Sequence, residues 1–226
     1  MDSPLDFLPV ICMIALLLVP LGRAQQSSTP PGISSSAHAR KSAPAPDSGL
    51  DPGSVSNGIY RNHDLGFKCK VPAGWVLRTE EMNEGDDGQA DQEPGKSGHV
   101  LLAAFSRPPA ARGEDVNSSI LIAAESTAEY PGLKEAAQYF GPVTGIAKAQ
   151  GFAVVEEPYE FAIGAKTLVR GDFQKDVGSR VMRQSTLVIL ARGYAVSLTF
   201  IGGTEDEVEE LIAGSSFAAG PKPHQR

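Results

Sequence analysis

The chain has 226 residues, of which 41% are hydrophobic and 21% charged, enough to build the core of one folded domain. It carries 20 Lys and Arg against 27 Asp and Glu, so its formal net charge is -7. A net negative charge repels polyanions. Composition therefore argues against nucleic acid, and also against anionic lipid, as a partner.

The N-terminus has the layout of an export signal. Residues 7–21 are almost wholly apolar, and Gly22 and Ala24 supply small residues at positions −3 and −1 of a cleavage site. The apolar run is about fifteen residues long, whereas a membrane-spanning helix needs about 20. We therefore expect residues 1–24 to be a signal peptide, cleaved near Ala24, and the mature protein to be periplasmic or secreted. The first six residues contain two Asp and no Lys or Arg, so an uncleaved anchor is the alternative.

One folded domain is expected between two irregular segments. Residues 25–56 are mostly Ser, Pro, Ala and Gly, which cannot bury enough apolar surface to offset their ordering entropy, so a disordered linker is predicted. Residues 218–226 are predicted to be a flexible tail, which leaves 57–217 for the domain. Because Cys12 falls in the signal, Cys69 is the single cysteine expected in the mature chain.

The domain begins with a predicted β-hairpin. Residues 59–61 and 65–71 flank a polar turn, and the second run alternates apolar residues with lysines. Cys69 lies on the apolar face of this strand, which predicts a buried, inert thiol rather than a nucleophile. Trp75 follows a Pro-Ala-Gly turn and is interpreted as a core anchor rather than a ligand platform.

The middle of the domain mixes a loop, strands and a helix. Residues 79–98 are acidic and rich in Gly, which predicts a surface loop. Residues 99–105 and 119–124 are apolar runs of strand length. Apolar residues from Leu133 to Ala147 then recur at helical spacing, and Pro142 is expected to kink or split that helix.

The last third predicts four strands and a closing helix. The strands are residues 152–156, 166–173, 180–190 and 194–201. Their short polar connections require antiparallel pairing. Thr204 and Glu207 form a capping box for a helix over Glu205 to Ile212, which Gly214 ends.

These elements predict the α+β class, with an antiparallel β-sheet flanked by two main helices in an α/β/α sandwich. Several segments resemble the PsbP-like superfamily: Tyr60, Leu65-Gly66-Phe67, Val71-Pro72-Ala73-Gly74-Trp75, Ile163-Gly164-Ala165-Lys166, Gly193-Tyr194 and Ser215-Ser216-Phe217. The resemblance covers about residues 57–217. It implies an antiparallel sheet between helices and a role in binding or assembly rather than catalysis. The acidic insert Glu80 to Glu93 departs from the family pattern.

Two acidic or glycine-rich motifs partly match known patterns for ligand sites. Residues 90–97 fit the loosest form of a phosphate-binding loop, but two acids and a proline oppose phosphate, and a strand rather than a helix is predicted to follow. The acids Glu80, Glu81, Glu84, Asp86, Asp87, Asp91 and Glu93 lack the register of an EF-hand loop. We therefore expect a solvated loop, with weak Ca²⁺ binding as the alternative.

No catalytic constellation emerges either. Of the four histidines, His63 and His99 alone fall within the predicted domain. The string Gly214-Ser215-Ser216-Phe217-Ala218 lacks the last Gly of a nucleophile elbow and follows a helix. The sequence thus assigns no catalytic, cofactor-binding or metal-ligating residue and no cofactor.

The sequence favours an exported, non-enzymatic binding or assembly module, with a protein or a cell-envelope component as partner. Two alternatives stay open: an enzyme or small-ligand carrier with a pocket between sheet and helix, and a metal-responsive module that uses the acidic loop. A pocket with converging polar groups would favour the first alternative.

Overall fold

The computed structural model describes residues 49–86, 98–111, 113 and 115–218, without the side chains of 84–86. The predicted signal peptide 1–24, most of the predicted linker, the phosphate-loop-like string 90–97 and residues 219–226 of the predicted tail lie outside the described residues. Among the described residues, no helix is both long and apolar enough to span a membrane.

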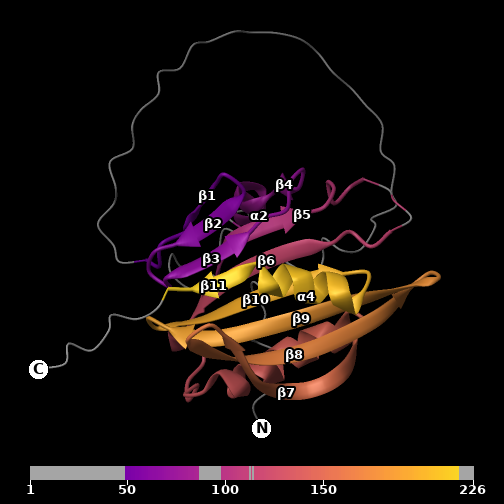
Figure 1. Ribbon diagram of the computed structural model, residues 1–226. Helices are drawn as coiled ribbons and strands as arrows, with labels where there is room; N and C mark the ends of the chain where they lie inside the picture. The colour runs from indigo at the N-terminus through magenta and orange to yellow at the C-terminus, as the bar shows by residue number, and fades with distance from the viewer. Residues whose placement is uncertain (1–48, 87–97, 112, 114, 219–226) are drawn as a thin grey trace, which may run out of the picture.

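A seven-stranded sheet forms the centre of the molecule (Figure 1). Its strands, in spatial order, are β4 (Val76–Leu77), β5 (His99–Phe105), β6 (Ser119–Ser126), β10 (Tyr194–Gly202), β9 (Arg180–Ala191), β8 (Lys166–Val177) and β7 (Ala153–Ile163). Every pairing is antiparallel, as the short connections predict. At the tight β9–β10 turn, Arg192 and Gly193 both have positive φ, 54° and 82°.

The predicted N-terminal hairpin is part of a second, four-stranded sheet. Its order is β1 (Ser54–Ser56), β2 (Ile59–Asn62), β3 (Phe67–Lys70) and β11 (Ser215–Phe217). Cys69 faces inward and is buried, while Lys68 and Lys70 point to solvent, so the predicted alternation is confirmed. This sheet and helix α4 (Glu205–Ala213) share one hydrophobic cluster with the large sheet, whose strand β10 contributes Val196, Leu198 and Phe200.

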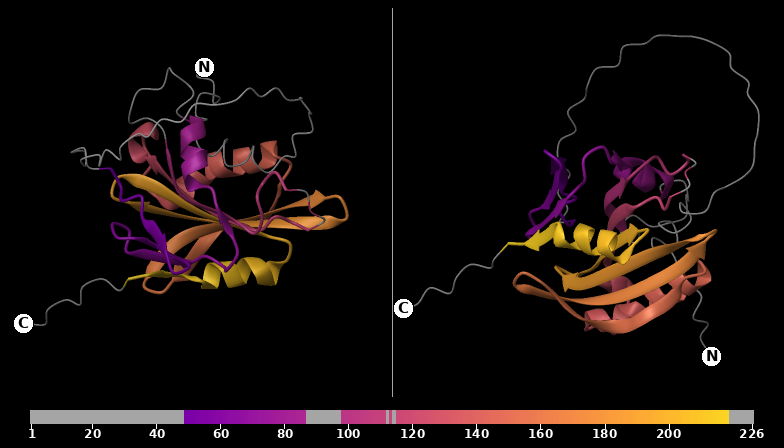
Figure 2. Two further views of the ribbon diagram at one scale, coloured as in Figure 1. Left: turned by 90° about the horizontal axis from the view of Figure 1, so that it is seen from above. Right: turned by 45° about the vertical axis from the view of Figure 1, so that its right-hand side comes forward.

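The opposite face of the large sheet carries the other helices. The 3₁₀ helix η2 (Ala136–Tyr139) continues into α3 (Phe140–Ala149), and both pack on Phe173, Val188 and Ala195. Pro142 lies in the first turn of α3, so the predicted helix is split into two pieces at this point. A shorter 3₁₀ helix, η1 (Thr127–Glu129), follows β6. Figure 2 shows α3 and α4 on opposite sides of the large sheet.

The structure confirms the α+β class and the antiparallel pairing but differs from the predicted sandwich in having two sheets. The additional sheet consists of the N-terminal strands β1–β3, and Ser215–Phe217 returns after the last helix to extend it by pairing with Phe67–Cys69. Three such residues carry too little periodicity to predict a strand. The predicted cap of α4 is present: the Thr204 hydroxyl accepts a hydrogen bond from the Glu207 amide at 3.1 Å. The Glu207 carboxylate accepts from the Gly203 amide, one residue before the expected partner.

The predicted loop over 79–98 begins instead as a helix, α2 (Thr79–Asp86). Tertiary contacts along strand β5 hold it. The Asn83 side-chain amide donates to the Val100 carbonyl at 2.9 Å and accepts from the Val100 amide at 3.0 Å, as a neighbouring strand would. The Thr79 hydroxyl accepts from the Ala103 amide. Met82 packs on the same edge of the sheet.

The predicted linker over 25–56 ends earlier than expected, because residues from Asp51 onward are tied to the hairpin. The Asp51 carboxylate accepts hydrogen bonds from the amides of Gly53 and His63, which lower its pKa. The Tyr60 hydroxyl donates to the Pro52 carbonyl at 3.0 Å. These contacts come from residues later in the chain, so local composition could not indicate them.

Candidate functional site

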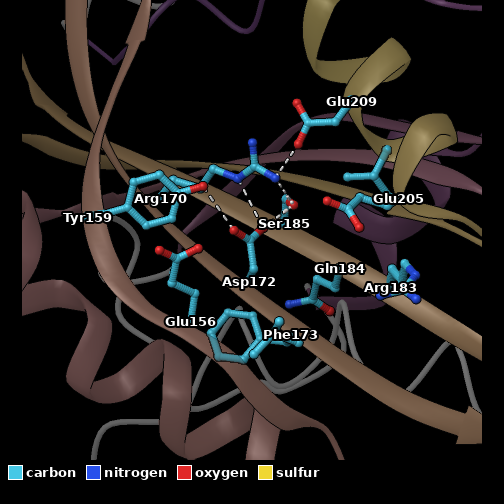
Figure 3. A pocket seen from close by; sticks show the side chains of 12 residues that line it. Glu156, Tyr159, Arg170, Asp172, Phe173, Arg183, Gln184, Ser185, Glu205 and Glu209 are labelled. Atoms are coloured by element: carbon cyan, nitrogen blue, oxygen red, sulfur yellow. Dashed lines mark hydrogen bonds and ion pairs between the residues drawn. The ribbon is translucent and has the colours of Figure 1, made fainter.

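A hollow of about 170 Å³ opens between the β7–β8–β9 part of the large sheet and the start of helix α4. Figure 3 shows polar side chains from all four elements converging on it. Its lining consists of Val155, Glu156, Tyr159, Arg170, Asp172, Phe173, Arg183, Gln184, Ser185, Glu205, Val208 and Glu209.

Arg170 organises the floor of the hollow and is 6% exposed. Its Nε lies 3.0 Å from Asp172 Oδ1, and one terminal nitrogen lies 3.0 Å from Ser185 Oγ and 2.5 Å from Glu209 Oε1. The Ser185 hydroxyl donates to the same Asp172 oxygen. Strands β8 and β9 and helix α4 are thus joined by one charge-assisted network.

Tyr159, on strand β7, completes this network. Its hydroxyl donates to Asp172 Oδ2 at 3.1 Å, and the Arg170 guanidinium lies 6.0 Å from its ring centre. Burial, together with the nearby Asp172 charge, raises the pKa of Tyr159 to about 12. Desolvation alone would lower the pKa of Arg170, but hydrogen bonds to Glu209 and Asp172 raise it. At neutral pH the tyrosine is therefore a neutral donor and the arginine a cation.

The hollow carries more negative than positive charge. Four carboxylates line it, against the guanidiniums of Arg170 and Arg183, which leaves two negative charges in excess. Arg170 with Asp172 and Glu209 accounts for one of these charges, and Glu156 and Glu205 with Arg183 account for the other. Val155 is 54% exposed at the rim. A cationic group with an adjoining apolar part fits this lining.

The candidate residues suggested by the sequence lie outside the hollow. His63 is exposed in the β2–β3 turn and His99 is exposed at the start of β5, in different sheets. Cys69 is 0% exposed, and burial raises the pKa of its thiol to about 11. Trp75 is partly buried and packs against the core from its margin. The hollow contains none of these side chains.

The remaining motifs form no site in the described part of the chain. Gly214 ends helix α4 and Ser215 bonds the Cys69 sulfur, so the string from Gly214 to Ala218 enters a strand and makes no elbow. Glu81, in α2, pairs with Arg78 at 2.6 Å. Among the residues described, no three His, Cys, Asp or Glu side chains are grouped to hold a metal ion.

A second polar cluster lies on the α3 side of the large sheet. Glu125 is 4% exposed at the end of β6, and its carboxylate accepts a hydrogen bond from the Tyr130 hydroxyl. The Tyr130 and Tyr139 rings meet edge to face at 5.2 Å. Burial and the neighbouring Glu125 raise the pKa of both tyrosines. The cluster is covered by protein, so we interpret it as a structural link between β6 and η2.

The sequence leaves open a pocket between sheet and helix but does not identify its lining residues, although a signal for them is present. Leu168, Arg170 and Asp172 alternate along β8 and therefore share one face of the sheet. Leu168 belongs to the core cluster, so two charged residues follow it on a buried face. Charged side chains on such a face are almost always paired. The partners Glu209 and Ser185 come from other elements and could not be found from spacing.

No family model matches the sequence, and no curated protein matches it. Solved structures with some likeness include a PsbP protein, the family that the sequence resembles. This cyanobacterial PsbP from Synechocystis sp. PCC 6803 has a TM-score of 0.43 at 14% identity, over 74% of this chain and 96% of that one.

Two further solved structures with some likeness come from a bacterium and a yeast. LpqN of Mycobacterium tuberculosis, described as involved in cell envelope biogenesis, has a TM-score of 0.36 at 14% identity, over 68% of this chain and 83% of that one. The Ran-binding protein Mog1p of Saccharomyces cerevisiae has a TM-score of 0.35 at 16% identity, over 68% of this chain and 80% of that one. With TM-scores below 0.5, these likenesses carry no statement about what this chain does.

Proposed function

We propose that this chain is an exported, non-enzymatic binding module whose hollow beside Arg170 receives a cationic side chain of a protein partner. The observation that carries the proposal is the excess of carboxylates in a hollow with a fixed floor. Glu156 and Glu205 supply negative charge that Arg170 does not neutralise, and Val155 offers apolar contact at the rim.

The floor is rigid, which favours binding. Arg170 and Ser185 are buried, and hydrogen bonds to Asp172 and Glu209 fix them in place. A site whose groups are already held loses little conformational entropy when a ligand arrives. The lysine or arginine of a partner would meet the exposed carboxylates of Glu156 and Glu205 above a floor that is already fixed.

The same bonds argue for binding rather than reaction at this place. The Ser185 hydroxyl donates to Asp172, an arrangement that resembles a serine nucleophile beside its general base. Yet both oxygens of Asp172 are already engaged: Oδ1 accepts from Arg170 at 3.0 Å and from Ser185, and Oδ2 accepts from Tyr159. The Ser185 oxygen itself accepts from Arg170, which lowers its nucleophilicity. The hollow is therefore proposed as a recognition site.

Titration of the ¹⁵N-labelled exported chain with the capped peptide acetyl-Lys-Lys-Lys-amide tests this function by NMR. We expect amide shifts around β7, β8 and the start of α4. The variant Glu156→Gln with Glu205→Gln should bind about tenfold more weakly, since each partly exposed charge contributes about 0.2–1 kcal/mol. The matched control is Glu157→Gln with Glu160→Gln, on the same strand but outside the lining.

The control separates site binding from general attraction to an acidic protein. Equal weakening in both variants, or shifts spread evenly over the surface, would contradict the proposal. If citrate shifts the same amides and the lysine peptide does not, a carrier of small anions becomes the better assignment.

A further inference from the structure

The four-stranded sheet presents a cationic outer face. In its pairing, Ser54, Arg61, Lys68 and Ser216 form one row across the strands, and Ser56, Ile59 and Lys70 form the next. Lys68 and Lys70 are exposed, whereas Tyr60, Phe67 and Cys69 point into the core. We call the seven residues of these two rows the basic face. It holds three cations and no carboxylate, in a chain whose net charge is -7.

The three cations lie close together without ion pairs. Arg61 and Lys68 are direct cross-strand neighbours, so their Cβ atoms are about 4.5–5.5 Å apart, and Lys70 stands two residues further along β3. Within the described part of the chain, none of the three pairs with a carboxylate. The Arg61 guanidinium donates only weakly, at 3.4 Å, to the main-chain oxygens of Ser56 and Ile59. Like charges placed directly opposite destabilise a sheet, so an external anion would stabilise this arrangement.

We propose that the basic face docks on an anionic phospholipid surface. The face is the outside of a small sheet with seryl hydroxyls between the cations, and it offers donors across its area rather than in a pocket. The centre of a specific protein interface is usually enriched in large apolar and aromatic side chains. The large apolar side chains exposed in the described residues are Leu77, Val155 and Val177, and none belongs to this face. A layer of phosphate headgroups fits it better than an acidic protein.

Net charge does not oppose this docking as strongly as composition predicts. At physiological ionic strength, charges are screened over about 8 Å, so a membrane senses the face that approaches it rather than the whole chain. The prediction that an acidic chain avoids anionic lipid treats its charge as evenly spread. Because Arg61, Lys68 and Lys70 are clustered, the charge is not evenly spread, and this one face is positive. This inference does not depend on the function proposed for the hollow.

Vesicle co-sedimentation of the exported chain tests the proposal. Vesicles of equal phosphatidylglycerol and phosphatidylcholine are compared with phosphatidylcholine alone, and the readout is the ratio of the two partition coefficients. Each Lys or Arg near an anionic membrane contributes about fivefold, so Arg61→Gln, Lys68→Gln and Lys70→Gln together should lower the ratio on the order of 100-fold. Binding should also vanish in 1 M salt.

A matched triple variant controls for net charge. Lys134→Gln, Lys148→Gln and Lys166→Gln remove the same charge from exposed positions outside the basic face, and this variant should keep the wild-type ratio. Circular dichroism melting checks that both triple variants fold. Equal losses in the two variants, or no preference of the wild type for phosphatidylglycerol at 50 mM salt, would overturn the proposal. Retention on immobilised poly-L-glutamate without vesicle binding would assign the face to an acidic polypeptide instead.

Discussion

Arg170 is a cation on the buried face of a strand, and its surroundings explain how the fold tolerates it. The guanidinium has partners on three elements, Asp172 on β8, Ser185 on β9 and Glu209 on α4, and lies 5.0 Å from the ring centre of Phe161. Burying a charge costs several kcal/mol unless such partners compensate. Removing one member therefore destabilises the fold by more than the whole network stabilises it, because the remaining charged groups are left buried without a partner.

We predict that Arg170→Ala lowers the free energy of unfolding by about 3–5 kcal/mol, since Asp172 would remain as an uncompensated charge. Urea denaturation followed by circular dichroism measures this. The matched control is Arg180→Ala, which breaks an exposed ion pair with Asp115 at 3.0 Å and should cost no more than about 1 kcal/mol. If both variants lose similarly small amounts of stability, then water rather than the network supplies the hydrogen bonds of Arg170.

At the scale of elements, a glycine sets how closely a helix approaches the sheet. Gly171 lies on the face of β8 opposite to Arg170, and a Cβ built there would come within 2.6 Å of the Phe140 ring at the start of α3. Gly145, inside the same helix, is exposed, and a Cβ there would meet nothing within 4 Å. Adding a side chain at the strand glycine, which has a close neighbour, should therefore destabilise the fold, whereas adding one at the solvent-facing helix glycine should stabilise it.

We expect Gly171→Ala to destabilise the protein by about 1–3 kcal/mol, because the added methyl group forces Phe140 outward. Gly145→Ala should stabilise it by about 0.5–1 kcal/mol, because Ala restricts the unfolded chain and favours helix. Thermal melts of the two variants beside the wild type measure both changes. A shift of the same sign in both would show that Gly171 does not determine the packing of α3.

Elements with local signals could be predicted from sequence, and those held by distant partners could not. The alternation of Phe67, Cys69 and Val71 and the Thr204 cap are local, and the structure has both features. Helix α2 depends on Asn83 bonding to Val100, seventeen residues away, and β1 depends on residues 51 to 62. The hollow needs Glu209, thirty-nine residues from Arg170. The hollow forms because strands β7 to β9 and helix α4 lie side by side in the fold, and the spacing of residues along the chain does not show which side chains meet there.

At the scale of the whole molecule, the two sheets meet over a core that contains the Cys69 thiol. Cys69 is buried with Tyr60 and Phe67 against Leu198 and Phe200 of the large sheet, and Ser215 donates to its sulfur at 3.6 Å. Its thiol can be modified only when the two layers separate. The thiol is therefore a reporter of how the layers open.

We predict that, in a chain that begins at Gln25, Cys69 reacts with Ellman's reagent at pH 8 at least about 1000-fold more slowly in the native state than in the unfolded state. The rate should rise with urea in parallel with global unfolding. Lys68→Cys in a Cys69→Ser background is the exposed control and should react freely. A slow rate that urea leaves unchanged would show that the small sheet opens on its own.

The pH dependence has a definite sign. Burial raises the thiol pKa from 9.0 to about 11, so the folded state favours the protonated, neutral thiol more strongly than the unfolded chain does. The stability contributed by Cys69 is full below pH 9 and is lost as pH rises from about 9 to 11.

Stretches at both sides of the large sheet are blocked to another strand, by different means. Where β5 extends beyond the short edge strand β4, the side chains of Thr79 and Asn83 occupy backbone groups that an incoming strand would use. At β7, Pro158 removes one donor, and the register shifts on both sides of Glu156 disrupt a regular ladder. Addition of a strand from another copy, the first step of amyloid-like growth, is therefore hindered along these stretches of the folded domain.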